Sequence, residues 1–84
     1  MVIETFRDAD LSAVEERFKR DGRMLPDGVT YHASWVERNG ERCFQLIEAA
    51  HIGRLNEWTS AWADLADFEI VPVETSAAFW AKRA

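Results

Sequence analysis

Residues 29–48 read VTYHASWVERNGERCFQLIE, and this stretch decides the fold. Two runs rich in β-branched and aromatic residues, 29–38 and 41–48, are separated only by Asn39-Gly40. An Asn-Gly pair between two such runs is a strong signal for a β-hairpin, because both residues tolerate the positive φ angles of a two-residue turn. The sequence therefore predicts two antiparallel strands joined by a tight turn.

The two-residue turn fixes which residues face each other across the hairpin. Glu37 is expected opposite Arg42 and Arg38 opposite Glu41, and the opposite charges of both pairs agree with this register. On one side of the hairpin, the register pairs Trp35 with Phe44, Ala33 with Leu46, and Tyr31 with Glu48. On the other side, it pairs Val36 with Cys43, Ser34 with Gln45, and His32 with Ile47. The first side is the more apolar and is expected to face the core.

The remaining elements follow from apolar spacing and from capping residues. We expect a strand over residues 1–6, a helix over about 10–21 capped by Asp8 or Asp10, a helix over about 51–66, a strand over 67–74 and a short last helix capped by Thr75 or Ser76. Pro72 cannot donate to a ladder, so its strand is expected at a sheet edge or to bulge there. No repeat or low-complexity segment divides the chain, and residues 1–84 are expected to form one domain.

This order of elements belongs to the α+β class. Strand, helix, strand, strand, helix, strand and helix is the βαββαβ arrangement of ferredoxin-like domains followed by one further helix. Right-handed crossovers place the first and third strands at the centre of a four-stranded antiparallel sheet and the fourth at an edge. Both main helices are then expected on one face of the sheet.

Two helices cover only one face of such a sheet, so the other face needs a partner. The covered face is expected to hold Trp35, Phe44, Leu46, Ala33, Phe68 and Ile70. The open face is expected to hold Val36, Ile47, Val71 and Val73 with His32, Ser34, Cys43 and Gln45, and with Glu4 and Glu69 as further candidates. This set is too apolar for a solvated surface, and a second copy of the chain is the simplest cover. We predict a homodimer through the open sheet face, with a ligand-sized gap where polar residues interrupt the packing.

Composition excludes several classes of function. The 84 residues carry 10 Lys and Arg against 15 Asp and Glu, a formal net charge of −5, which disfavours nucleic-acid binding. No apolar run approaches the roughly 20 residues of a membrane span, and the first residues lack the basic start of a signal peptide. The single cysteine, Cys43, fits a reducing compartment, so we expect a cytoplasmic protein.

A family resemblance extends over nearly the whole chain. It rests on residues 22–28 (GRMLPDG), 34–37 (SWVE) and 42–46 (RCFQL), and continues through Trp58, Trp62, Asp64-Leu65, Asp67-Phe68-Glu69 and Pro72-Val73. These motifs resemble a family of small bacterial proteins that is known only as a domain of unknown function. More distantly, the element order is similar to the dimeric α+β barrel group, which includes cofactor-independent monooxygenases and muconolactone isomerase-like enzymes. That likeness implies a dimeric barrel but no catalytic residues.

The candidate pocket residues are the polar and aromatic side chains of the strands: Glu4, His32, Ser34, Trp35, Cys43 and Gln45. Two hypotheses remain. In the first, the chain is a non-enzymatic module that binds a small apolar or aromatic ligand or only serves assembly. In the second, it is a cofactor-independent monooxygenase or isomerase of a hydrophobic aromatic substrate, with His32 as general base, Glu4 orienting it, and Ser34 or Gln45 donating to an oxyanion.

Structural roles compete with each functional one. A lone strand histidine is more often hydrogen-bonded than catalytic. Trp58 and Trp62, with Trp35 and Phe44, offer rings that can stack an aromatic ligand, but their spacing is also that of an ordinary core helix. Arg23 lies in a loop, where it either binds a carboxylate or is simply solvated or caps a helix. The two histidines and one thiol have no companions at metal-ligand spacing, and no glycine-rich phosphate loop occurs, so we expect neither a metal nor a cofactor.

Overall fold

The computed structural model describes residues 1–7 and 11–83. Its elements are β1 (Val2–Phe6), α1 (Leu11–Asp21), β2 (Val29–Val36), β3 (Arg42–Ala49), α2 (Ile52–Trp62), β4 (Ala66–Ile70) and α3 (Ser76–Arg83). The α+β class and the predicted order of elements are confirmed. Asp8 and Asp10, predicted as caps of the first helix, lie outside the described residues.

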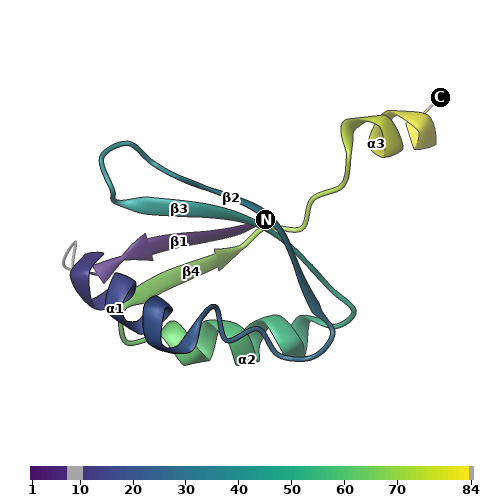
Figure 1. The fold of residues 1–84 in the computed structure, drawn as a ribbon. Helices are drawn as coiled ribbons and strands as arrows, with labels where there is room; N and C mark the ends of the chain where they lie inside the picture. Colours follow the sequence, from purple (N-terminus) through teal and green to yellow (C-terminus); the bar gives the residue numbers. More distant parts are fainter. Residues whose placement is uncertain (8–10, 84) are drawn as a thin grey trace.

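The strands form one antiparallel sheet in the order β2-β3-β1-β4. This is the predicted ferredoxin-like arrangement, with the first and third strands in the centre and the fourth at an edge. Figure 1 shows α1 and α2 together on one face of the sheet, whereas α3 stands away from the body. The buried core lies between the sheet and α2 and consists of Val2, Leu55, Trp58 and Trp62.

The predicted hairpin register holds next to the turn and fails further along. Val36 pairs with Cys43 and Trp35 with Phe44, as predicted, and the Arg42 guanidinium binds Glu37 at 2.6 Å. β2 nevertheless ends at Val36 and β3 begins at Arg42, so the turn between them is longer than the two residues predicted. The amide of Gly40 donates to the carbonyl of Glu37, and only Gly40 of the Asn-Gly pair takes a positive φ, which excludes the predicted turn type.

An irregularity between Tyr31 and Ala33 shifts the rest of the hairpin by one residue. Tyr31 therefore pairs with Ile47 instead of Glu48, and His32, predicted opposite Ile47, occupies the irregular position. A β-bulge of this kind adds one residue to a single strand. No prediction from the turn could include it.

The two faces of the sheet are the reverse of those predicted for the hairpin. Val2 pairs with Gln45 and Glu4 with Cys43, and all four of these residues are buried on the helix-covered face. The residues expected beneath the helices, Trp35, Phe44, Leu46 and Ala33, alternate with them and face away from the helices. Trp35 remains 56% exposed. The prediction weighed hydrophobicity alone, whereas the buried polar residues Glu4 and Gln45 are compatible with the covered face because a loop arginine lies beside them.

The end of the chain differs from the prediction in its boundaries. α2 ends at Trp62 and β4 already ends at Ile70, so Pro72 lies beyond the edge strand. Phe68 and Ile70 pack against the core, as predicted, whereas Val71 and Val73 follow the strand and are not part of an open sheet face. The hydroxyl oxygen of Thr75 accepts a hydrogen bond from the main-chain amide of Ala78, which confirms Thr75 as the cap of α3.

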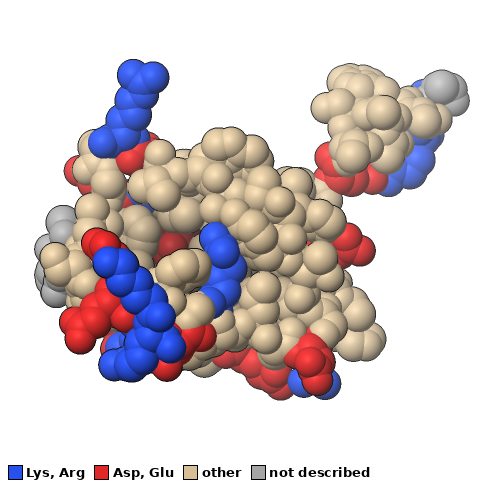
Figure 2. All heavy atoms as spheres, in the orientation of Figure 1, with Lys and Arg blue, Asp and Glu red and all other residues tan. Residues whose placement is uncertain are grey.

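In the view of Figure 2, charged side chains lie over the helices, at the end of the β2–β3 hairpin and on α3, and they are sparse over the middle of the strands. Figure 2 shows Lys, Arg, Asp and Glu gathered over α1 and the lower edge, with a mainly uncharged surface above, where the strands lie. Among the described residues, no helix is long and apolar enough to cross a membrane.

Candidate functional site

A cavity of about 340 Å³ lies between the helices and the sheet. Its floor is formed by the covered faces of β1, β2 and β3, and its walls by α1, α2 and the loop between α1 and β2. The volume is within the usual range for small-molecule sites. A few polar side chains on the floor interrupt an otherwise apolar lining.

The apolar walls come mainly from the two helices. Trp58 and Trp62, one turn apart on α2, are 2% and 5% exposed, and their rings line the inner wall. On α1, Leu11, Val14 and Phe18 line the outer wall, and Leu11 and Phe18 remain 43% and 44% exposed. The apolar stripe of α1 is therefore incompletely covered by the sheet. A molecule in the cavity would remove more of this stripe from water.

The polar groups of the cavity surround Arg23. Its guanidinium donates to Gln45 Oε1 and to Ser34 Oγ, each at 3.4 Å, and lies 3.7 Å above the ring of Tyr31. The hydroxyls of Tyr31 and Ser34 are 2.8 Å apart. Neither hydrogen bond from Arg23 has the short length of a bond to a carboxylate.

Two buried groups of the floor have altered acidity. Burial raises the pKa of Glu4 to about 7, although the Arg23 charge and a hydrogen bond with Gln45 both oppose the increase. Burial also raises the pKa of the Cys43 thiol to about 11, so the thiol stays protonated at neutral pH. Cys43 is therefore a poor nucleophile, whereas Glu4 can exchange a proton near neutrality.

The loop that carries Arg23 is held by the two tryptophans of α2. The indole N–H groups of Trp58 and Trp62 both donate to the main-chain carbonyl of Arg23, at 2.9 and 3.1 Å. The next residue, Met24, has a φ of 59°, a left-handed conformation that is unfavourable for a non-glycine residue. The chain turns sharply here, so that the Arg23 side chain lies over β2.

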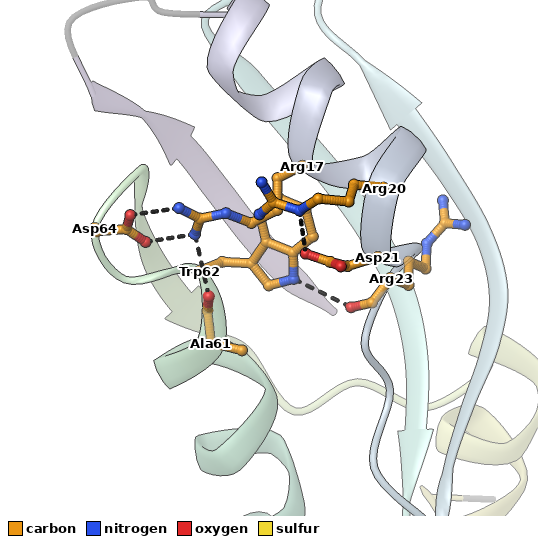
Figure 3. Close-up of polar contacts among 7 residues, drawn as sticks. All are labelled: Arg17, Arg20, Asp21, Arg23, Ala61, Trp62 and Asp64. Atoms are coloured by element: carbon orange, nitrogen blue, oxygen red, sulfur yellow. Dashed lines mark hydrogen bonds and ion pairs between the residues drawn. The ribbon is translucent and has the colours of Figure 1, made fainter.

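A salt bridge holds α1 against the end of α2. Figure 3 shows Arg17 of α1 reaching Asp64 and the carbonyl of Ala61. The two terminal guanidinium nitrogens, Nη1 and Nη2, each lie 2.6 Å from an Asp64 oxygen, and Nη1 donates also to the carbonyl of Ala61. The Arg17 guanidinium lies 5.6 Å from the ring of Trp62. No residue of α1 is fully buried, so apolar packing alone does not hold this helix. The contacts of Arg17 therefore help to position α1, which is the outer wall of the cavity.

The structure brings together four of the six predicted pocket residues. Glu4, Ser34, Cys43 and Gln45 all line this cavity, but beneath the helices rather than on the open sheet face. His32 and Trp35 are not among the residues that line it. His32 Nε2 is 2.9 Å from Glu48 Oε1, and the His32 side chain is 45% exposed; its carboxylate partner is therefore Glu48 and not Glu4. Trp35 lies on the opposite face of the sheet.

The predicted pocket contains no residue of the helices or of the loop. For Arg23 the sequence leaves carboxylate binding and a structural role open, and for Trp58 and Trp62 it leaves stacking of an aromatic ligand and an ordinary core role open. The signal for Trp58 and Trp62 is their spacing of one turn on an apolar helix face, which places both indoles side by side. No local pattern predicts that both rings bind the carbonyl of Arg23, because 35 and 39 residues separate the partners.

The described residues offer no metal site, since no three His, Cys, Asp or Glu side chains gather among residues 1–7 and 11–83. The fold and cavity define a small α+β domain of ferredoxin-like topology. A family model described as "Domain of unknown function (DUF3303)" matches residues 1–83, so the chain belongs to this family. No curated protein and no solved structure matches the chain.

Proposed function

We propose that the protein binds a small apolar or aromatic molecule in the cavity between the sheet and helices α1 and α2. The observation that carries this proposal is the cavity of about 340 Å³, walled by buried indole rings and floored by a compact polar group. Ligand sites usually combine a mainly apolar lining with a few convergent polar groups. The half-exposed Leu11 and Phe18 support the same conclusion, because an occupant would cover them.

A neutral aromatic probe tests the proposal without assuming any charge on the ligand. We expect 2-naphthol to bind and to shift the indole N–H signals of Trp58 and Trp62 in ¹H–¹⁵N spectra, because both rings line the cavity. Val14→Phe fills the cavity from α1 and should abolish binding. Ser12→Phe, at an exposed position of the same helix, is the matched control and should bind as the natural chain does. Binding that survives Val14→Phe would place the probe elsewhere and contradict the proposal.

We also propose that the open sheet face pairs with the same face of a second copy. This face carries Ile3, Ala33, Trp35, Phe44 and Leu46, which cross-strand pairing brings together across β1, β2 and β3. Four strands about 4.8 Å apart and 5–8 residues long give a face on the order of 400 Å² in projection. Pleated side chains raise its accessible area toward the roughly 800 Å² per partner of a stable interface. A second copy offers the same apolar face.

We further propose a cytoplasmic location, which the free thiol of Cys43 supports.

A second candidate function is cofactor-independent catalysis on an aromatic substrate, an isomerisation or an oxygenation. Glu4 favours it specifically, because a buried carboxyl with a pKa of about 7 suits proton abstraction at neutral pH. Glu4 replaces His32 as the candidate base. Exchange of the acidic C–H of a bound substrate with deuterated solvent tests this role, and equal exchange with the natural chain and with Glu4→Gln would exclude it.

A further inference from the structure

The side chains that line the cavity carry different numbers of positive and negative groups. The described lining includes one cation, Arg23, and two carboxyls, Glu4 and Glu15. Glu15 forms an ion pair with Lys19 on the same helix, with 2.8 Å between the charged atoms. Among residues 1–7 and 11–83, no carboxylate lies within 4 Å of Arg23, whereas Arg17 and Arg42 each bind one through two nitrogens.

Arg23 is nevertheless held in a fixed place. The ring of Tyr31 packs 3.7 Å from its guanidinium carbon and the ring of Phe18 5.2 Å from it. Two neutral oxygens, on Ser34 and Gln45, accept its long hydrogen bonds. A guanidinium has five N–H donors in a planar fork that fits a carboxylate through two parallel bonds. An incoming carboxylate therefore gains stronger bonds than the neutral oxygens supply.

We propose that the ligand is an aromatic carboxylic acid bound as its anion, with the carboxylate on Arg23 and the aromatic ring against Trp58 and Trp62. This inference rests on the proposed function of the cavity and adds the class of ligand. Aromatic walls supply the affinity for the ring. Arg23 supplies the selection for the acid over a neutral molecule of the same shape.

The charge of Glu4 makes the affinity depend on pH. Among the described residues, the groups that face Glu4 are Arg23 from the loop, Cys43 and Gln45 from β3, Phe68 from β4 and, across the cavity, Glu15 of α1 and the uncharged indoles of α2. The raised pKa keeps Cys43 protonated, and the lowered pKa keeps Glu15 ionised, between pH 6 and pH 8. Within this set only Glu4 changes charge in that interval. When Glu4 is protonated, it does not compete with the ligand for the positive charge of Arg23. The anion therefore binds more tightly at the lower pH.

Calorimetric titration of the full chain with 1-naphthoate and with its neutral counterpart 1-naphthamide tests the inference. At pH 6 we expect naphthoate to bind at least about tenfold more tightly than naphthamide, which is the lower end of what a charged hydrogen-bond pair contributes. From pH 6 to pH 8 the affinity for naphthoate should fall by about tenfold, the change in the protonated fraction of a group with a pKa of about 7. The affinity for naphthamide should stay constant.

Two variants separate the roles of the charged groups. Arg23→Gln should abolish the preference for naphthoate and retain binding of naphthamide, and Glu4→Gln should keep the preference and lose its pH dependence. The Arg20 guanidinium forms a hydrogen bond and ion pair with the neighbouring Asp21, outside the cavity lining, and Arg20→Gln is therefore the matched control for the loss of one positive charge. Should Arg23→Gln not fold, the comparison of the two probes on the natural chain still decides. Equal affinity for both probes overturns the inference and leaves the proposed function intact, whereas no binding of either probe, nor of 2-naphthol, removes both.

Discussion

The ionisation of Glu4 makes the stability of the fold depend on pH in a direction opposite to that of most carboxylates. Its pKa is 4.5 in the unfolded chain and about 7 in the folded one, because burial disfavours the charged form. The folded protein therefore holds a proton between pH 4.5 and pH 7 that the unfolded chain has released. The stabilisation is complete below pH 4.5 and is lost as the pH rises to 7.

The magnitude follows from the size of the shift. About 2.5 pKa units at 1.36 kcal/mol each correspond to about 3 kcal/mol of folding free energy lost by pH 8. Glu4→Gln keeps the shape of the side chain and cannot ionise. We expect this variant to be more stable than the natural chain by up to about 3 kcal/mol at pH 8, relative to their difference at pH 4.5.

Urea unfolding followed by tryptophan fluorescence at several pH values, with the chain concentration held constant, measures this difference. Comparison with the variant cancels the titration of all other groups. Glu15→Gln is the control at the rim of the same cavity: its pKa is lowered by Lys19, so the variant should gain no stability at pH 8. A stability difference between the natural chain and Glu4→Gln that is the same at pH 4.5 and pH 8 would show that Glu4 ionises at no cost, and the reasoning would fail.

Three further substitutions or reactions test other parts of the structure. Trp35→Lys places a charge on the open sheet face and should convert a dimer to a monomer in sedimentation velocity; an unchanged sedimentation coefficient contradicts pairing through this face. Asp64→Asn removes the partner of Arg17, whose contact lowers the pKa of Asp64 below its ordinary 3.8, so the variant should melt at a lower temperature than the natural chain at pH 7, and the difference should shrink as the pH falls below 3.8 and Asp64 becomes protonated; a difference that does not change with pH contradicts the ion pair. Cys43, with a pKa raised from 9.0 to about 11, should react with iodoacetamide at pH 8 roughly a hundredfold more slowly in the folded chain than in urea, and equal rates would contradict its burial.

Local patterns predict the elements of this chain well because each signal acts over a few residues. The strand runs around Asn39-Gly40 predict β2 and β3, and the opposite charges of Glu37 and Arg42 predict a contact that the structure contains. The bulge at His32 has no such signal. It lies between Tyr31 and Ala33, and its effect is to shift the pairing of residues 29–31 by one position.

The faces of the hairpin were predicted in reverse because side-chain hydrophobicity is a poor guide when a sheet has two apolar faces. Alternation correctly grouped Ser34, Cys43 and Gln45 on one side, since strand periodicity alone decides which residues share a face. Which of the two faces the helices cover depends on the path of the chain after each strand. The Trp35 side is the more apolar one, and yet it is the side that the helices leave open.

The polar floor and the loop explain why the less apolar face is the covered one. The indoles of Trp58 and Trp62 both bind the carbonyl of Arg23 and so hold the loop over the sheet. The arginine side chain then donates to Gln45 and lowers the cost of a charge on Glu4, and among the described residues no buried polar side-chain atom lacks a partner. Interior polar groups that are satisfied in this way do not oppose burial. The covered face therefore contains a cavity with a cation and a titratable acid, features that a sheet packed only by apolar residues would lack.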